Sequence, residues 1–255
     1  MPSHYDDRNF NYRDYWQGRN YEHSSEILAI RSLLSDRHFH KAADIGGGYG
    51  RLVPLLAQFA DHVILVEPSV KQCQIAKNFL KDFLTRVNIQ TGTAGHTGLP
   101  DNSLDLVIMI RVMHHLPQPV NALRELNRIL KPGGILVLEF ANSHHFKARI
   151  GSFLSGQPLL PTPVERRSPA NIRRKTISFV NHSPYTVKKQ LSKSGFGILK
   201  TLSVSNFRSP FLKKILPHRL LVTLESKIQS VLADSNFGPS IFIYARKNTP
   251  DSQPA

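Results

Sequence analysis

Five short apolar runs, separated by segments with helical spacing or turn residues, occupy the chain from about residue 40 to residue 141. They lie at residues 42–45, 62–66, 87–91, 104–110 and 135–140. We interpret these runs as apolar enough to be strands that helices cover on both faces of a sheet. Strands that alternate with helices are joined by crossovers, which favours parallel pairing. The pattern predicts an α/β fold with a mostly parallel sheet and helices on both faces.

Helix signals lie between and around these predicted strands. The apolar spacing predicts helices at about residues 21–35, 52–59, 69–83, 120–130, 184–194 and 210–232. Ser69 is a suitable N-cap for the third of them, and Lys131-Pro132-Gly133-Gly134 predicts a turn after the fourth. The inward face expected for the first helix consists of Ile27, Leu28, Ile30, Leu33 and Leu34. Two later apolar runs, at residues 198–204 and 240–245, are predicted as strands.

The composition along the chain divides it into five expected parts. They are an aromatic and helical cap (1–36), the cofactor-binding half of a domain (37–143), a basic Pro-rich insertion (144–182), the rest of the sheet domain (183–246) and a disordered tail (247–255). The insertion mixes four prolines with Arg166, Arg167, Arg173, Arg174 and Lys175. We interpret it as a substrate lid that contributes no strand to the main sheet.

Charge and cysteine content limit the class of protein. The net charge is +15, and residues 144–255 hold 18 basic against 4 acidic side chains. This excess predicts an anionic partner for the C-terminal part: an acidic small molecule, nucleic acid or a membrane surface. A single cysteine, Cys73, excludes an internal disulfide and fits a reducing compartment. Without a signal-peptide pattern or an apolar run of membrane-spanning length, we expect a cytoplasmic protein with no transmembrane segment.

The most informative motif is Asp44-Ile45-Gly46-Gly47-Gly48-Tyr49-Gly50, at the end of the first predicted strand. Glycines here allow a sharp turn and a close approach of backbone to a ligand. The spacing differs from the dinucleotide motif G-x-G-x-x-G, because Arg51 occupies the position of the last glycine. Glu67 ends the second strand, where a carboxylate can accept both hydroxyls of a ribose. The pair predicts a nucleoside cofactor; a glycine turn without ligand is the alternative for the loop alone.

Further motifs follow in order, and together they carry a family resemblance. They are Gly92-Thr93-Ala94, Leu99-Pro100-Asp101-Asn102-Ser103-Leu104-Asp105, His114-His115-Leu116 and Leu130-Lys131-Pro132-Gly133-Gly134. Residues 41–141 resemble the class I S-adenosylmethionine-dependent methyltransferases, and within them the type 11, small-molecule branch with the ubiquinone and menaquinone C-methyltransferases. The resemblance implies a Rossmann-like seven-stranded sheet completed by residues 198–204 and 240–245, with S-adenosyl-L-methionine as the cofactor.

The resemblance also implies roles for individual residues. Gly46, Gly48 and Gly50 would line the methionine and ribose end of the cofactor, Asp44 would order the loop, and Glu67 would take the ribose hydroxyls. Relatives often hold the adenine amino group with an acid after the third strand, where this chain has Thr93 and Ala94. Arg111, just after the fourth strand, is a further cofactor-binding candidate.

Two candidates near the cofactor are read from side-chain chemistry. Arg19 could pair with the cofactor's carboxylate, and a surface arginine is the alternative. Tyr12, Tyr15, Trp16 and Tyr21 could face the sulfonium charge or simply pack against the sheet.

Methyl transfer needs no catalytic triad and no metal, because the sulfonium already makes the methyl group electrophilic. A base is needed when the acceptor must lose a proton, and His114 and His115 are the candidates, with a polar helix start as the alternative. His144 and His145 are further candidates. His38 and His40 have metal-like spacing, but without paired cysteines or an H-E-x-x-H motif we expect no metal site.

We therefore expect methyl transfer to a small organic acceptor, with the basic insertion suited to an anionic one. An RNA methyltransferase is the alternative; the chain shows no RNA-binding module, and Ile110-Arg111-Val112-Met113 stands where amino-methylating enzymes carry N/D-P-P-[YFW]. A non-catalytic cofactor-binding protein, or a membrane-surface protein using residues 210–232, is a third hypothesis. For that stretch, an apolar face packed on the core is the competing interpretation. No pattern in the sequence predicts an oligomeric state.

Overall fold

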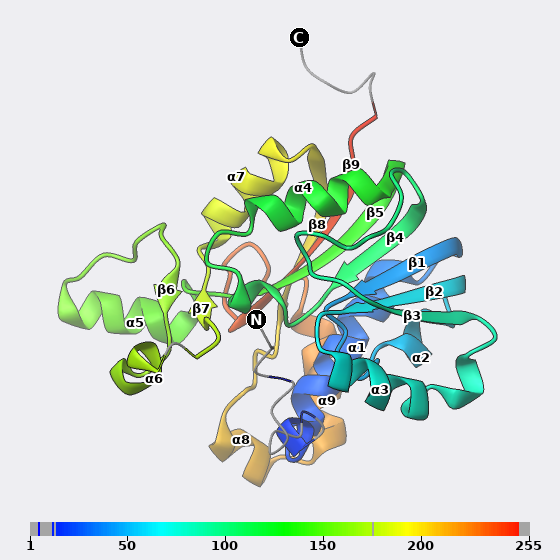
Figure 1. Ribbon diagram of the computed structural model, residues 1–255. Coiled ribbons are helices and arrows are strands. Elements are labelled where there is room, and N and C mark those ends of the chain that lie inside the picture. Colours follow the sequence, from blue (N-terminus) through cyan, green and yellow to red (C-terminus); the bar gives the residue numbers. More distant parts are fainter. Residues whose placement is uncertain (1–4, 6–11, 13, 175, 250–255) are drawn as a thin grey trace.

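A twisted seven-stranded sheet with helices on both faces forms the body of the molecule (Figure 1). The computed structural model describes residues 5, 12, 14–174 and 176–249. The strands are β1 Phe39–Ile45, β2 Ala60–Glu67, β3 Val87–Thr91, β4 Leu104–Met109, β5 Leu130–Ala141, β8 Phe196–Val204 and β9 Ser240–Lys247. Their order is β3-β2-β1-β4-β5-β9-β8, and β9 is antiparallel to both neighbours. The predicted Rossmann-like fold is confirmed, including the two C-terminal strands.

The helices that flank the sheet bury two apolar layers, one on each face. These helices are α1 Asn20–Leu34, α2 Val53–Leu56, α3 Val70–Phe79, α4 Val120–Ile129, α7 Pro184–Lys193 and α9 His218–Ile228; α8 Pro210–Ile215 has no buried residue. Leu33 and Leu56 belong to one layer, and Leu126 and Val187 to the other. Within the described part of the chain, no helix is both long and apolar enough to cross a membrane.

Several predicted boundaries were wrong, each for a local reason. The helix expected over residues 210–232 is divided into α8 and α9 at Pro217, which has no amide hydrogen and keeps Leu216 extended. The helix expected over residues 69–83 ends at Phe79, and a 3₁₀ turn follows at Lys81–Phe83. The helix expected at residues 52–59 is limited to α2, because Gln58 and Phe59 donate to carbonyls three residues back.

The turn expected at Lys131–Gly134 lies inside β5. Leu104 of β4 pairs with Leu130, and Leu106 pairs with Ile135, so the intervening residues bulge out of the ladder. Gly133 has φ +76°, which a bulge of this kind tolerates. The predicted start of the disordered tail, residue 247, is also too early. Lys247 is the last residue of β9, and the Asn248 backbone amide donates to the Gly195 carbonyl. Residues 250–255 lie outside the described part.

Helix α1 is rotated relative to the prediction. Its buried face includes Glu22 and Glu26 beside Ile30 and Leu33, while Ile27 is only partly buried. The carboxylates point inward because basic side chains from other elements meet them there. A hydrophobic pattern ranks carboxylates as outward-facing and could not predict this rotation.

The insertion stands apart from the sheet, as expected. It contains α5 Phe146–Ser155, β6 Val164–Glu165, α6 Pro169–Arg173 and β7 Val180–Asn181, and β6 and β7 pair only with each other as a small separate sheet. Figure 1 shows α5 and α6 projecting from the body beside the carboxyl ends of the strands. Neither helix has a buried residue.

Candidate functional site

A cavity of about 260 Å³, here called the loop cavity, lies at the carboxyl ends of β1, β2 and β4. Predicted site residues among its walls are Gly46, Gly48, Glu67, Thr93, Ala94, Arg111 and His115. Tyr12 and Gln72 line it as well. Carboxyl ends of parallel strands at a change of strand order are the usual ligand position in open α/β sheets. Residues separated by almost 70 positions in the sequence therefore meet around one space.

The glycine loop is shaped by backbone conformation and by close packing. Gly46, Gly48 and Gly50 have φ of 72°, 60° and 83°, in the region that favours glycine. A Cβ on Gly46 would lie 2.5 Å from a methyl of Val112, and one on Gly50 would lie 2.6 Å from a methyl of Leu80. Gly50 does not line the loop cavity, so packing against the core already explains its presence.

Glu67 connects the loop to the start of α3. One carboxylate oxygen accepts from the Gly48 amide at 3.0 Å, and the other accepts from the Ser69 amide at 3.0 Å. The Ser69 hydroxyl in turn caps α3, as predicted, by accepting from the backbone N–H of Gln72 at 3.1 Å. Glu67 thereby holds the glycine loop and the start of α3 together at the wall of the loop cavity.

Two buried polar side chains at this site have no hydrogen-bond partner among the described residues. They are Asp44, 1% exposed, and Gln72, fully buried, whose amide oxygen and nitrogen are both unpaired. Burial raises the pKa of Asp44 to about 7, with Glu67 adding to the rise and Arg51 opposing it. Unpaired buried polar groups are uncommon and concentrate at functional sites. Sequence reasoning missed Gln72, although a polar residue on the Cys73 and Ala76 face of α3 is a detectable signal.

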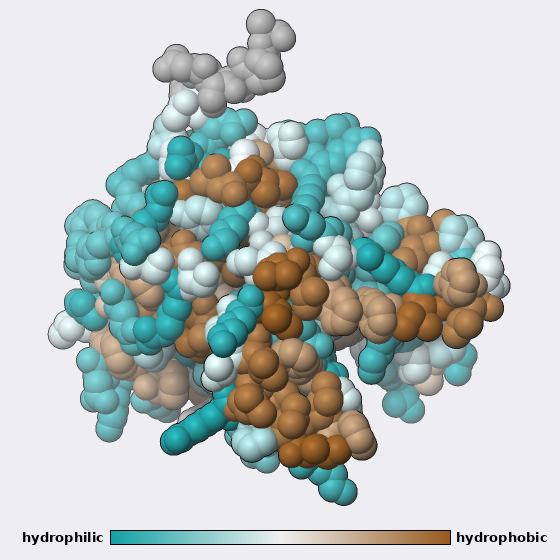
Figure 2. Space-filling view, turned by 180° about the vertical axis from the view of Figure 1, so that it is seen from behind, coloured by the Kyte–Doolittle hydropathy of each residue, from teal (hydrophilic) through white to brown (hydrophobic). Residues whose placement is uncertain are grey.

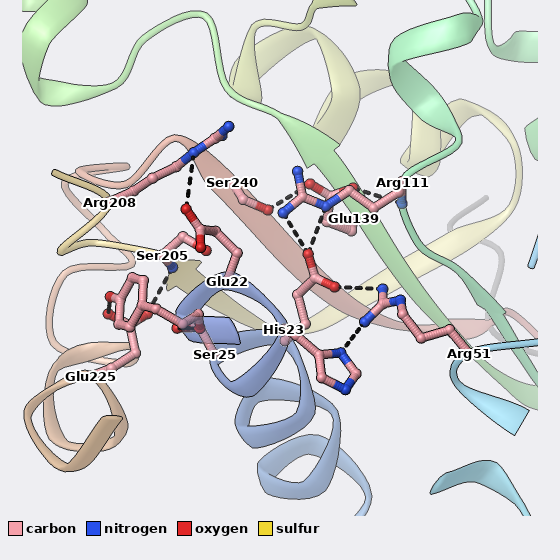
Figure 3. A network of polar contacts seen from close by, with 12 residues as sticks. Glu22, His23, Ser25, Arg51, Arg111, Glu139, Ser205, Arg208, Glu225 and Ser240 are labelled. Carbon is pink, nitrogen blue, oxygen red and sulfur yellow. Dashed lines mark hydrogen bonds and ion pairs between the residues drawn. The ribbon is translucent and has the colours of Figure 1, made fainter. Parts of the chain in front are cut away.

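A buried ionic network supports one wall of the loop cavity (Figure 3). Glu26 of α1 accepts from Arg51 at 2.7 Å and from Arg111 Nε at 2.6 Å. Burial acts to raise the pKa of Glu26, but the two guanidiniums outweigh it and hold the pKa below its ordinary value. Arg51 also lies 3.7 Å from the ring centre of Trp16. The network joins α1, the end of the glycine loop and the end of β4, and sequence reasoning did not single out Glu26.

A second cavity of about 250 Å³, here called the adjacent cavity, shares Arg111 with the first. Its other polar walls are His114, Glu139, His145, Arg166, Asn181 and Arg208. Arg111 has φ +63°, unusual for a residue with a side chain, and its amide donates to Glu139 at 2.9 Å. The Ser240 hydroxyl donates to the other oxygen of Glu139 at 2.5 Å. Burial raises the pKa of Glu139, and Arg111 opposes the rise.

The two predicted histidines face different cavities. His115 lines the loop cavity, and its ring nitrogens contact the Tyr5 hydroxyl at 2.7 Å and the Ser178 carbonyl at 2.8 Å. His114 lines the adjacent cavity, with its ring centre 4.7 Å from that of Phe179. Burial, together with His115, Arg111 and His182, holds the pKa of His114 well below its ordinary value. His114 is therefore a neutral imidazole at pH 7.

The structure places other predicted residues away from the loop cavity. Arg19 precedes α1 in a separate recess with Glu22 and Lys213. Tyr21 donates to Glu225 at 2.6 Å. His145 lines the adjacent cavity, while His144 contacts Ser143 outside it.

The basic residues of the insertion are also separated. Arg166 lines the adjacent cavity, and Arg167 pairs with Glu165 at 2.7 Å. Arg173 and Arg174 are exposed, and Lys175 lies outside the described residues. In the described part of the chain, no group of three or more His, Cys, Asp or Glu is arranged to hold a metal.

Comparison with known proteins agrees with this geometry. Residues 43–138 match the family model described as a methyltransferase domain. The chain is 25% identical over 144 residues to the uncharacterized methyltransferase YcgJ of Bacillus subtilis, covering 54% of this chain and 53% of that protein. It is 31% identical over 134 residues to a demethylmenaquinone methyltransferase of Tropheryma whipplei, covering 47% of this chain and 55% of that protein. The chain thus spans about half the length of the curated relatives it matches.

Solved structures show the same fold over nearly the whole chain. A methyltransferase from Thermotoga maritima, titled a possible histamine N-methyltransferase, superposes with a TM-score of 0.60 at 22% identity, covering 93% of this chain and 94% of that one. The fold and the family imply S-adenosylmethionine as the cofactor. Residues 43–138 therefore match a methyltransferase domain, and the fold around them is that of S-adenosylmethionine-dependent methyltransferases.

Proposed function

We propose that this protein transfers the methyl group of S-adenosylmethionine to a small organic acceptor that carries an anionic group. The observation that carries the proposal is the loop cavity, whose walls combine a strand-end carboxylate, a glycine turn and an unpaired buried amide. Within this set the Gln72 side-chain amide has no hydrogen-bond partner in the described structure, and the combination fits a polar nucleoside ligand.

The residues of the loop cavity fit this cofactor. Glu67 lines the cavity at the end of β2, where a carboxylate can accept from ribose hydroxyls, and the Gln72 side-chain amide offers both a donor and an acceptor to the nucleoside. The Thr93 hydroxyl oxygen accepts from the His96 amide at 3.1 Å, so its hydrogen stays available to donate. When bound, the cofactor supplies a methyl group on a positively charged sulfur, which a nucleophile can attack directly. Asp44, beside the loop, would favour that positive charge when ionised.

The adjacent cavity is the proposed acceptor site. It shares Arg111 with the loop cavity, which brings the two spaces together at the end of β4. Arg166 from the insertion and Arg208 after β8 face it from separate elements and favour a carboxylate or phosphate group. Its volume of about 250 Å³ favours a small molecule over a polymer.

His114 is the proposed proton acceptor for an acceptor atom that carries a proton. Its neutral imidazole faces the adjacent cavity, whereas both nitrogens of His115 already contact Tyr5 and Ser178. We assign His115 a positioning role, since it ties the insertion to the loop cavity. With the cofactor held by the loop cavity and supplying its methyl group, His114 would take up the proton that the acceptor atom loses on methylation.

A labelling experiment tests the proposal. The protein is incubated with methyl-labelled cofactor and a metabolite extract, alongside an Arg166→Gln variant and a matched Arg173→Gln control on exposed α6. We expect label in an acidic small molecule, at least tenfold less with Arg166→Gln, and unchanged labelling with the control. Label confined to RNA would instead support the nucleic-acid alternative, and labelling that is unaffected by Arg166→Gln would remove the assigned acceptor site.

A further inference from the structure

Helix α5 of the insertion presents an apolar stripe to solvent. Phe146, Ile150, Phe153 and Leu154 follow the spacing of one helix face, and Phe153 and Leu154 are 86% and 77% exposed. A stripe of this kind normally packs against a core. None of the ten residues of α5 is buried; Phe146 stacks on Phe237 with 4.7 Å between ring centres, while Phe153 and Leu154 at the other end of the stripe lie mostly in solvent.

Helix α8 repeats the arrangement on a second element. Phe211 and Ile215, one turn apart, are 69% and 59% exposed, and α8 has no buried residue. We expected this stretch to pack on the core, and the structure shows that only the α9 part does so, through Leu221. Figure 2, seen from behind, shows apolar residues gathered over the region of α8 and again over α5.

Charge distinguishes the candidate partners of these two stripes. Residues 144–182 contain seven Lys and Arg against a single acid, Glu165, which pairs with Arg167. Residues 205–224 contain four Lys and Arg and no acid, and two of the four, Arg208 and Lys213, pair with Glu22 of α1. Lys147 and Lys214, on α5 and α8 themselves, are exposed. A second copy of the chain would bring like charges together, whereas an anionic lipid surface attracts this combination of apolar and basic side chains.

The two helices that carry the stripes begin close to residues of the adjacent cavity. His145, the N-cap of α5, lines that cavity, and so does Arg208, two residues before α8 begins. A surface that contacted both helices would therefore lie at the entrance side of the proposed acceptor site. This position suits an acceptor that partitions between a membrane and the protein.

We propose that α5 and α8 together dock the protein on an anionic phospholipid membrane, with Phe153, Leu154 and Phe211 inserted among the headgroups. Lys147 and Lys214 contribute electrostatic attraction, which salt weakens because their charges are exposed. The docking does not depend on methyl transfer, since it uses side chains outside both cavities.

Vesicle flotation with the full chain tests the proposal. The vesicles consist of phosphatidylcholine alone, or of equal parts phosphatidylcholine and phosphatidylglycerol. We expect flotation with the anionic vesicles at low salt and little with the neutral ones. The double variant Phe153→Ser/Leu154→Ser should bind at least tenfold more weakly, because it removes two large apolar side chains from the membrane contact. The matched control is Leu84→Ser, which alters a leucine that is 47% exposed at the opposite edge of the sheet.

Folding and self-association are measured on the same samples. The thermal midpoint and the affinity for S-adenosylhomocysteine should match the wild type in both variants, because the altered side chains contact solvent. Absence of flotation with anionic vesicles at low salt overturns the proposal. So does a double variant that floats like the control. A wild type that sediments as a dimer, and a double variant that sediments as a monomer, would assign the surface to self-association instead.

Discussion

Replacing Asp44 with Asn tests whether a buried, unpaired carboxyl group sits beneath the glycine loop. A group whose pKa is raised on folding binds its proton more tightly in the folded protein, so it contributes stability below its unfolded pKa and loses that contribution as pH rises through the folded pKa. For Asp44 this range runs from the ordinary value of 3.8 to about 7. At about 1.4 kcal/mol per pH unit, linkage gives a loss of roughly 2.5 kcal/mol between about pH 5 and pH 8.

The Asp44→Asn variant cannot titrate at this position, so it lacks this loss. Urea unfolding of both proteins at about pH 5 and about pH 8 should show the wild type losing roughly 2 to 3 kcal/mol relative to the variant. Any constant cost of the buried Asn amide cancels, because the difference between the two pH values is compared. Histidines that titrate in this range do so in both proteins. An equal stability difference at both pH values would mean that the carboxyl group has a partner or contacts water, and the reasoning would fail.

Three further changes test the site. Gln72→Ala should weaken S-adenosylhomocysteine binding by about threefold to tenfold in calorimetry without lowering the thermal midpoint, because the side-chain amide makes no hydrogen bond in the described structure; a lower midpoint with unchanged affinity contradicts a ligand role. His114→Gln should reduce the methyl-transfer rate by roughly a hundredfold with unchanged cofactor affinity, whereas an unaltered rate removes the proton-acceptor role. Glu26→Gln leaves the charges of Arg51 and Arg111 without a counter-charge and should lower the free energy of unfolding by about 3 kcal/mol, and a loss below about 1 kcal/mol by chemical denaturation would argue against the network.

The sheet could be predicted because its signals are local. Leu104–Met109 is apolar enough and short enough to identify a strand without knowledge of its neighbours, and Asp44 to Gly50 and Glu67 mark the ends of two strands. Parallel pairing then brings those ends together, which is why the lining of the loop cavity could be expected in large part.

Long-range charge pairing could not be predicted in the same way. Glu26 faces inward because it meets Arg51 and Arg111, which are 25 and 85 positions away. The division of His114 and His115 between two cavities depends on how Phe179 and Ser178 of the insertion pack against them. Neither arrangement has a periodic signature, because each depends on contacts that the fold alone creates.

Calorimetric titration with S-adenosylhomocysteine and with NADH tests the central claim, that the loop cavity is a methyltransferase cofactor site. Wild type should bind S-adenosylhomocysteine and not NADH. Glu67→Gln should bind it more than tenfold more weakly, because the variant loses charge-assisted acceptors for two hydroxyl groups. Asp82→Asn, which alters an exposed carboxylate outside the cavity, should bind as the wild type does. Binding of NADH without S-adenosylhomocysteine, or a Glu67→Gln variant with wild-type affinity, would contradict the account.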